Sequence, residues 1–236
     1  SLAQILRVST MTIRRDLDYL AEQNIVRFYH GGVVFNPHFL EKETNPNDYF
    51  LPRQTMLHKE EKDRIAKKAL ELIVPQETIM LDSGTTIYYL ARELPENQNL
   101  TVISWSLNVL EELIRKPRNN ILVQGGIYHQ ETQMFENTQG LDTIKNSRAS
   151  KVFISAGGFH INLGITTPFH YEVETKRAAI KYSMTSVLLI DSSKFGKVCS
   201  AHMTDTGDFR TIITDSGISP EYEEYIRSAG LELFIV

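Results

Sequence analysis

Hydrophobic residues recur along this chain with two different spacings. In the first part, Ile13, Leu17 and Leu20 stand at i, i+4 and i+7, which places them on one face of a helix. From Thr78 onward, short apolar runs alternate with amphipathic segments. The second pattern predicts buried strands that alternate with helices, and therefore a mostly parallel sheet with helices on both faces.

An amphipathic helix that starts at residue 58 is expected to precede the alternating pattern. The expected strands cover 78–81, 100–104, 121–124, 151–155, 187–191, 211–214 and 231–236. The expected helices cover 58–73, 87–91, 107–115, 137–146, 171–184 and 220–229. The fold class predicted for residues 58–236 is therefore α/β.

The first residues predict a helix-turn-helix. A short helix over 2–6 is followed by a turn at Val8-Ser9 and by a longer helix to about Gln23, which Ser9 can cap. Residues 25–34 then predict a hairpin, the wing of a winged helix-turn-helix. Side chains near the start of the second helix meet phosphates and base edges in such domains. The candidate DNA-binding residues are Ser9, Met11, Thr12, Arg14, Arg15 and His30.

Prolines mark the region between the two patterns. Pro37, Pro46 and Pro52 fall within 20 residues of one another, among asparagines and an aspartate, so little regular structure is expected. The chain is therefore divided into a DNA-binding domain over 1–35, a linker over 36–57 and a larger domain over 58–236.

Composition narrows the class of protein. A net charge of −4 argues against a binder of polyanions over its whole surface, so any DNA contact must be local. The single cysteine, Cys199, excludes an internal disulfide framework and fits the cytoplasm. Seven scattered histidines lack ligand spacing, and we expect no metal site. No apolar run approaches the roughly 20 residues of a membrane span, so no membrane partner is expected.

The turn after the first predicted strand has the composition of an anion site. It consists of Asp82, Ser83, Gly84, Thr85 and Thr86, and a helix is expected to follow. The first N–H groups of a helix lack intrahelical partners, and Gly84 allows close approach of a ligand. The turn alone is explained equally well as an ordinary strand-to-helix connection. No G-K-[ST] follows, so nucleotide hydrolysis is not implied.

Other polar or glycine-rich turns follow the predicted strands. In such sheets ligands bind at the carboxyl ends of strands. The further candidates for effector binding are Ser104, Ser106, Gly125, Gly126, Gly157, Gly158, Lys176 and Lys194. Lys194 can neutralise a phosphate, whereas Lys176 stands four residues after Glu172 and can equally form a helical ion pair.

The N-terminal motif resembles the signature of the DeoR family of bacterial transcriptional regulators. Residues 8–17 read V-S-T-M-T-I-R-R-D-L, and residues 27–33 read R-F-Y-H-G-G-V. The resemblance implies a winged helix whose second helix enters the major groove. It also leads us to expect that the helix preceding Leu2 in such domains is absent from this sequence.

The larger domain also resembles the DeoR family. The matching strings are D-S-G-T-T at 82–86, G-I-T-T-P at 164–168 and D-S-S-K-F-G at 191–196. The resemblance implies a sugar-phosphate-binding fold related to ribose-5-phosphate isomerase and CoA transferases, with the phosphate at the first string and the lysine of the last beside it. Two strings depart from the family: Trp105 stands where a small polar residue is usual, and residues 156–160 lack two usual acids.

The leading hypothesis is a DNA-binding repressor of a sugar or nucleoside catabolic operon, modulated by a phosphorylated sugar. Its expected partners are operator DNA, that sugar and a second copy of the chain; no catalytic residue and no cofactor are expected. The alternative is an enzyme of the same fold resembling a sugar-phosphate isomerase. That reaction needs a positioned base, for which Glu172 or Glu174 are candidates.

Overall fold

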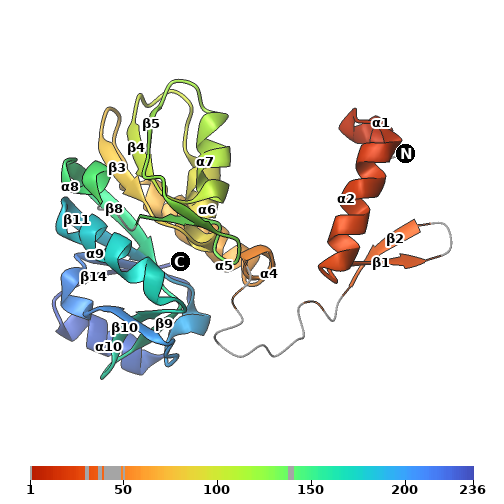
Figure 1. Cartoon of the computed structure of the whole chain (residues 1–236). Coiled ribbons are helices and arrows are strands. Elements are labelled where there is room, and N and C mark those ends of the chain that lie inside the picture. Colours follow the sequence, from red (N-terminus) through yellow and green to blue (C-terminus); the bar gives the residue numbers. More distant parts are fainter. Residues whose placement is uncertain (1, 30–31, 37–38, 40–48, 50, 138–140) are drawn as a thin grey trace. The chain divides into compact units, whose positions relative to one another are not determined.

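The computed structural model contains two compact units, Ser1–Thr44 and Asn45–Val236 (Figure 1). It describes residues 2–29, 32–36, 39, 49, 51–137 and 141–236. Each unit has buried residues of its own. His30 and the tip of the predicted wing lie outside the described residues.

The N-terminal unit contains the predicted helix-turn-helix and hairpin. Helix α1 (Leu2–Leu6) precedes α2 (Thr10–Glu22), and strand β1 (Val26–Tyr29) pairs antiparallel with β2 (Gly32–Phe35). The Ser9 hydroxyl accepts a hydrogen bond from the Thr12 N–H at 3.0 Å, which caps α2 as predicted. The elements expected from the sequence are therefore confirmed in this unit.

The larger unit is built on a parallel sheet of seven strands. They are β3 (Thr78–Leu81), β4 (Thr101–Ser104), β5 (Asn120–Val123), β8 (Ala149–Ser155), β11 (Ser183–Leu189), β13 (Thr211–Thr214) and β14 (Glu232–Ile235). Their order is β14-β13-β11-β8-β3-β4-β5. The chain therefore builds outward from β3 in one direction through β4 and β5, and in the other from β8 to β14.

Helices cover both faces of this sheet, as predicted (Figure 1). Residues of α5 (Lys59–Leu70), α6 (Thr85–Glu93) and α7 (Leu107–Ile114) share one core with Ile79 and Leu81 of β3. Residues of α8 (Asp142–Lys145), α9 (Val173–Lys181) and α10 (Pro220–Ser228) share the other core with Met80. Alternate residues of one strand thus enter opposite cores, which is why the strands appear in the sequence as continuous apolar runs.

Two small antiparallel sheets were not predicted. Strands β9 (Gly158–His160), β10 (Gly164–Thr167) and β12 (Ala201–Thr204) form one of them. Strands β6 (Ile127–His129) and β7 (Met134–Glu136) form the other. Each of these short strands contains a glycine, histidine or glutamate, so no continuous apolar run marks it in the sequence.

The predicted linker 36–57 is wrong at its C-terminal end. Helix α4 (Leu51–Met56) forms there, and Leu51 is buried in the larger unit. Pro52 is the second residue of this helix, where its missing N–H has no intrahelical partner to lose. Proline at a helix start was thus mistaken for irregular structure.

Candidate functional site

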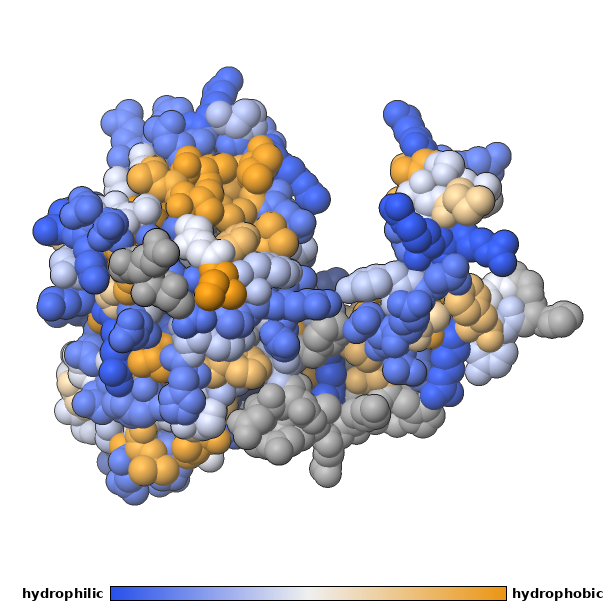
Figure 2. Space-filling view, viewed as in Figure 1, coloured by the Kyte–Doolittle hydropathy of each residue, from blue (hydrophilic) through white to orange (hydrophobic). Residues whose placement is uncertain are grey.

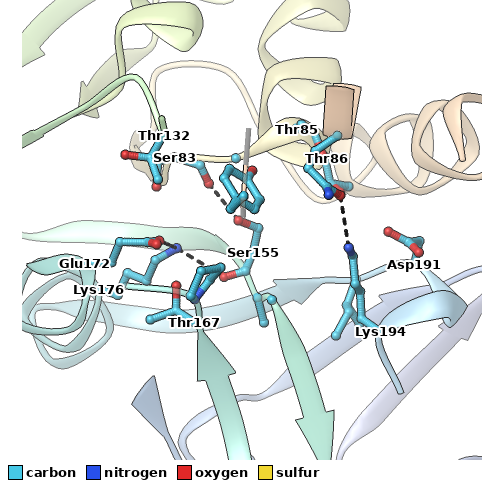
Figure 3. A pocket seen from close by; sticks show the side chains of 17 residues that line it. Ser83, Thr85, Thr86, Thr132, Ser155, Thr167, Glu172, Lys176, Asp191 and Lys194 are labelled. Atoms are coloured by element: carbon cyan, nitrogen blue, oxygen red, sulfur yellow. Dashed lines mark hydrogen bonds and ion pairs between the residues drawn. The ribbon is translucent and has the colours of Figure 1, made fainter. Parts of the chain in front are cut away.

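A pocket lies at the carboxyl ends of β3, β8 and β11 (Figure 3). It contains about 520 Å³ of empty space, part of it open to solvent. Strands β3 and β8 are neighbours in the sheet, but the chain leaves them in opposite directions. Such a switch point leaves a crevice between the connections, and this is where open α/β sheets bind ligands.

The turn between β3 and α6 forms one wall. Ser83, Gly84, Thr85 and Thr86 all line the pocket, and the three hydroxyl residues are buried. Gly84 has φ +110, and a Cβ there would collide with the Ser155 hydroxyl. Glycine is therefore required to bring the start of α6 up to the pocket. The N–H groups at this helix start can donate to an anion.

Lys194 lies across the pocket from this turn (Figure 3). It ends the short 3-10 helix η2 (Ser192–Lys194), whose N-cap Asp191 accepts from the Ser193 N–H at 3.2 Å. Asp215 accepts from the Ser192 N–H at 2.6 Å and fixes the same turn. Burial lowers the pKa of Lys194, and the nearby Lys197 adds to the effect, while Asp191 opposes it. No carboxylate of a described residue forms an ion pair with Lys194.

The opposite end of the pocket holds a buried ion network. The Lys176 ammonium lies 2.5 Å from Asp82 and 3.3 Å from Glu172, and all three side chains are almost fully buried. Asp82 also accepts from the Ser155 N–H at 2.9 Å. Burial by itself lowers the pKa of Lys176, but the two carboxylates outweigh it and raise that pKa. Burial and the neighbouring Asp82 raise the pKa of Glu172 against the effect of Lys176.

One aromatic side chain, Tyr49, lines the pocket, and a row of stacked rings extends away from it. The Tyr49 ring meets Phe169 edge-on, with 6.4 Å between ring centroids, and Phe169 stacks on Tyr171 at 5.1 Å. Tyr171 in turn stacks on His129 of β6 at 3.7 Å, and its hydroxyl lies 3.1 Å from that of Thr132. Burial raises the pKa of Tyr49, as do the charges of Glu172 and Asp82, so its hydroxyl stays protonated and able to donate.

The structure brings together only part of the predicted effector site. Seven predicted residues line the pocket: Ser83, Gly84, Thr85, Thr86, Gly157, Lys176 and Lys194. Asp82 does not line it but fixes Lys176 and Ser155. Ser104, Ser106, Gly125, Gly126 and Gly158 also lie outside the lining. Ser104 ends β4, and the next three follow β4 or β5; these two strands lie beyond β3 on the side away from β8, at roughly 5 Å per strand.

The lining also contains residues that were not predicted to belong to the site. They are Tyr49, Gln54, Thr132, Ser155, Ala156, Thr167, Pro168 and Ile190, together with Glu172 and Asp191, which the sequence indicated only as a possible base and as part of a turn. Ser155 ends a predicted strand next to Gly157, so strand ends alone could have identified it. Tyr49 and Gln54 fall in the predicted linker, and no sequence signal connects them to the turns.

The candidate DNA-binding residues are placed at the start of α2. Ser9 is its N-cap, and the Thr12 hydroxyl lies 2.8 Å from that of Ser9. Met11 and Arg14 are exposed, and the Arg15 side chain is 81% exposed, with a loose 3.9 Å contact to Asp16. Ile13, Leu17 and Leu20 are half-buried, as the spacing predicted. Arg14 and Arg15 are thus accessible to a large partner.

The described residues offer neither a metal site nor a membrane span. Within these parts of the chain, no group of three or more His, Cys, Asp or Glu side chains is arranged to hold a metal ion. No helix among them combines the length and the apolar character needed to cross a membrane.

Comparison with known proteins gives the family. The model of the DeoR C-terminal sensor domain matches residues 57–216, and that of the DeoR-like helix-turn-helix domain matches residues 1–39. The HTH-type transcriptional regulator GolR of Listeria innocua is 36% identical over 99% of this chain and 90% of its own length. The deoxyribose operon repressor of Escherichia coli is 31% identical over 98% of this chain and 88% of its own length.

Solved structures give only a distant likeness. Ribose 5-phosphate isomerase A from Neisseria gonorrhoeae has a TM-score of 0.43 and 18% identity, over 60% of this chain and 54% of its own. The two relatives named above match over nearly the whole chain and have the names of regulators, and not of enzymes, so the isomerase alternative is not supported. The chain belongs to the DeoR family of transcriptional repressors, with a helix-turn-helix at its N-terminus and a sensor domain after it.

Proposed function

We propose that this repressor binds operator DNA through α2 and responds to a phosphorylated sugar bound in the pocket at the ends of β3, β8 and β11. One observation carries the proposal: the hydroxyl-rich start of α6 faces Lys194, whose ammonium forms no ion pair with a described carboxylate. Helix N–H groups, hydroxyls and an unpaired ammonium on two sides of one cavity suit a phosphate.

The other end of the pocket suits the hydroxyl groups of a sugar. Glu172 lines it, and its Oε1 has no hydrogen-bond partner among the described residues although it is buried. Such an oxygen gains from a donor supplied by a ligand. Thr132 and Tyr49 add hydroxyls on the same lining. Lys176 is already held by two carboxylates, so we assign the phosphate to the Lys194 end.

The relatives narrow the class of sugar to be tested. One of them is named as a deoxyribose operon repressor, and another as a lactose phosphotransferase system repressor. We infer that the genes controlled by this chain serve the catabolism of a sugar or nucleoside, and that it acts in the cytoplasm, where the operator is. Pentose and hexose phosphates are the first ligands to test.

DNA binding is assigned to the start of α2. Arg14 and Arg15 extend into solvent from the first turns of this helix. Arg15→Ala should weaken operator binding by about 1–3 kcal/mol if Arg15 contacts a base. The native protein and the variant are each titrated with operator DNA and with an unrelated duplex. If both bind the operator with equal affinity, Arg15 is not part of the interface.

A second copy of the chain is the remaining proposed partner. Operators with two-fold half-sites are bound by two-fold dimers. Strand β5 is an edge of the sheet, and Leu122, Val123 and the nearby Ile127 and Ile114 are exposed; Figure 2 shows an apolar area over β5 and α7. We propose that this edge pairs with its copy. Val123→Lys should then lower the mass measured by light scattering, and an unchanged oligomer would exclude this edge.

The experiment that tests the sensor function is a thermal-shift screen. The purified chain is heated with pentose and hexose phosphates, each beside its free sugar. Mass action predicts stabilisation by any compound that binds the native state, by about 2.7 kcal/mol at a hundredfold excess over Kd. Stabilisation by the phosphorylated form alone supports the proposal. Equal stabilisation by the free sugar would contradict the assignment of the phosphate to Lys194 and α6.

A further inference from the structure

Helix α4 is the first described helix after the boundary between the two units, and it is fixed to the larger unit at three points. The Leu51 N–H donates to the Glu131 carbonyl at 3.0 Å, and the Thr55 carbonyl accepts from the Tyr89 hydroxyl at 3.1 Å. The buried Lys62 ammonium donates to the carbonyls of Gln54 and Leu57 near the helix end. None of these backbone bonds involves a pocket residue other than Gln54.

The side chain of Gln54 has a different environment from its backbone. It lines the pocket, and its Oε1 accepts a hydrogen bond from the Lys194 ammonium at 3.3 Å. Charge-assisted bonds of this kind are usually about 2.7–2.9 Å, so this bond is long and easily given up. Lys194 is the same cation that we assigned to the phosphate, and Gln54 is therefore next to the proposed anion.

A bound anion at this place would change the favoured hydrogen-bonding role of the Gln54 amide from acceptor to donor. With the pocket empty, the amide oxygen is the group that suits a neighbouring ammonium. A phosphate beside Lys194 brings acceptor oxygens, which repel the amide oxygen and attract the amide NH₂. A rotation of the terminal amide exchanges the two without moving the backbone, which Lys62 and Tyr89 hold.

We propose that Gln54 is a ligand-binding residue that links occupancy of the pocket to helix α4: its amide oxygen accepts from Lys194 when no anion is bound, and its NH₂ donates to the anion when one is. This inference rests on the proposed function, because it needs the phosphate to bind at Lys194. The added hydrogen bond makes α4 part of the ligand-bound state, on the segment through which the chain continues from the DNA-binding unit.

The test uses the whole chain with three probes: inorganic phosphate, ribose 5-phosphate and glucose 6-phosphate. Their affinities are measured by calorimetry for the native protein and for Gln54→Leu. Loss of one hydrogen bond to a charged group should weaken the tightest-bound phosphorylated probe about tenfold or more. Met56→Leu is the matched control, since Met56 is on the same helix, is exposed and does not line the pocket; it should leave affinity unchanged.

A second variant tests the position of Gln54 with a charge, and hydrogen exchange tests the link to helix α4. Gln54→Glu keeps the length of the side chain and places a carboxylate opposite Lys194, so an ion pair should form and occupy the position of the phosphate. Binding of the phosphorylated probes should fall more than for Gln54→Leu. Hydrogen exchange over residues 51–57 adds a local measure: the probe should slow exchange there in the native protein and in Met56→Leu, but not in Gln54→Leu.

The outcomes distinguish this inference from the proposed function. If the native protein binds a phosphorylated probe and both Gln54 variants bind it equally well, Gln54 is not a ligand residue and the proposed function stands. If Gln54→Leu binds the phosphorylated probe normally and Lys194→Met does not, Gln54 is again not a ligand residue and the proposed function stands. If the native protein binds none of the three probes, the assignment of phosphate to this end fails, and the role of Gln54 fails with it.

Discussion

The two lysines of the pocket, Lys176 and Lys194, stand at opposite ends of the same cavity and have different surroundings (Figure 3). The Lys176 ammonium forms ion pairs with two buried carboxylates, whereas the Lys194 ammonium forms none with a described carboxylate and donates a hydrogen bond to the amide oxygen of Gln54. Burial acts against the charge of both. Only for Lys176 do the partners compensate, so its charge serves the fold. The charge of Lys194 is left for a ligand.

The largest effect is expected on stability, from a change beside Lys176 in the buried ion network. Asp82→Asn removes one carboxylate from Lys176 and should lower the free energy of unfolding by about 3–5 kcal/mol, because a buried charge loses the nearer of its two partners. Urea denaturation measures this. Asp63→Asn is the control: its ion pairs with Lys67 and Arg92 are partly exposed and should be worth less than about 1 kcal/mol. Equal losses for both variants would mean that burial does not distinguish the two sites.

The next largest effect is expected at Lys194, and it concerns ligand affinity instead of stability. Lys194→Met should weaken phosphorylated ligands by about 1.5–3 kcal/mol and leave free sugars almost unaffected. The free energy of unfolding without ligand should stay constant or rise, since a half-buried cation without a carboxylate partner is removed. Calorimetry and urea denaturation test the two parts. A destabilised variant would show that Lys194, like Lys176, serves the fold.

The shape of the turn opposite Lys194 gives a third test. Gly84→Ala places a Cβ against the Ser155 hydroxyl at φ +110, and should cost about 1–3 kcal/mol of stability as well as the response to phosphorylated ligands. Gly125→Ala is the control, because its Cβ would meet nothing within 4 Å. Thermal unfolding with and without ligand measures both. Normal ligand binding by Gly84→Ala would place the phosphate elsewhere.

A third lysine gives the smallest expected effect. Burial lowers the pKa of Lys62 to about 8, and Lys194 adds to the shift against Asp191 and Glu61. Between about pH 8 and its ordinary value of 10.5, the unfolded chain binds this proton and the folded chain does not, so stability should rise with pH in that window. The gain relative to Lys62→Met should be about 1–2 kcal/mol between about pH 8 and 9.5. If the free energy of unfolding of the native protein and that of Lys62→Met change with pH in parallel, the lowered pKa of Lys62 is excluded.

The fold could be predicted well from the sequence where an element has a continuous apolar run or an apolar face. Apolar runs such as 78–81 and 211–214 identified β3 and β13 with their observed bounds, because strands buried on both sides are apolar throughout. The strands of the two small sheets are interrupted by glycine, histidine or glutamate and show no apolar run. The helix α4 was hidden by Pro52, because proline occurs both in loops and at helix starts.

The candidate site was predicted in part, and the reason lies in the order of the strands. Turns at strand ends share one edge of a parallel sheet, and this rule grouped Thr85, Gly157 and Lys194, which line one pocket. The same rule included Ser106 and Gly125, which do not line it, because the order β8-β3-β4-β5 depends on pairing between distant segments and has no local signal. Gln54 reaches the pocket through a contact 140 residues away in the chain, which no local pattern can predict.

The sequence separations across the pocket have a consequence for protein synthesis. Lys176 joins Asp82 across 94 residues, and Lys194 joins Gln54 across 140. The helix-turn-helix leaves the ribosome long before either lysine has been added to the nascent chain. A nonsense mutation between codons 82 and 194 therefore leaves the DNA-binding helices encoded, while Lys194 and the end of the pocket to which we assign the phosphate are lost. Shortened alleles of this kind should lose the response to the sugar phosphate.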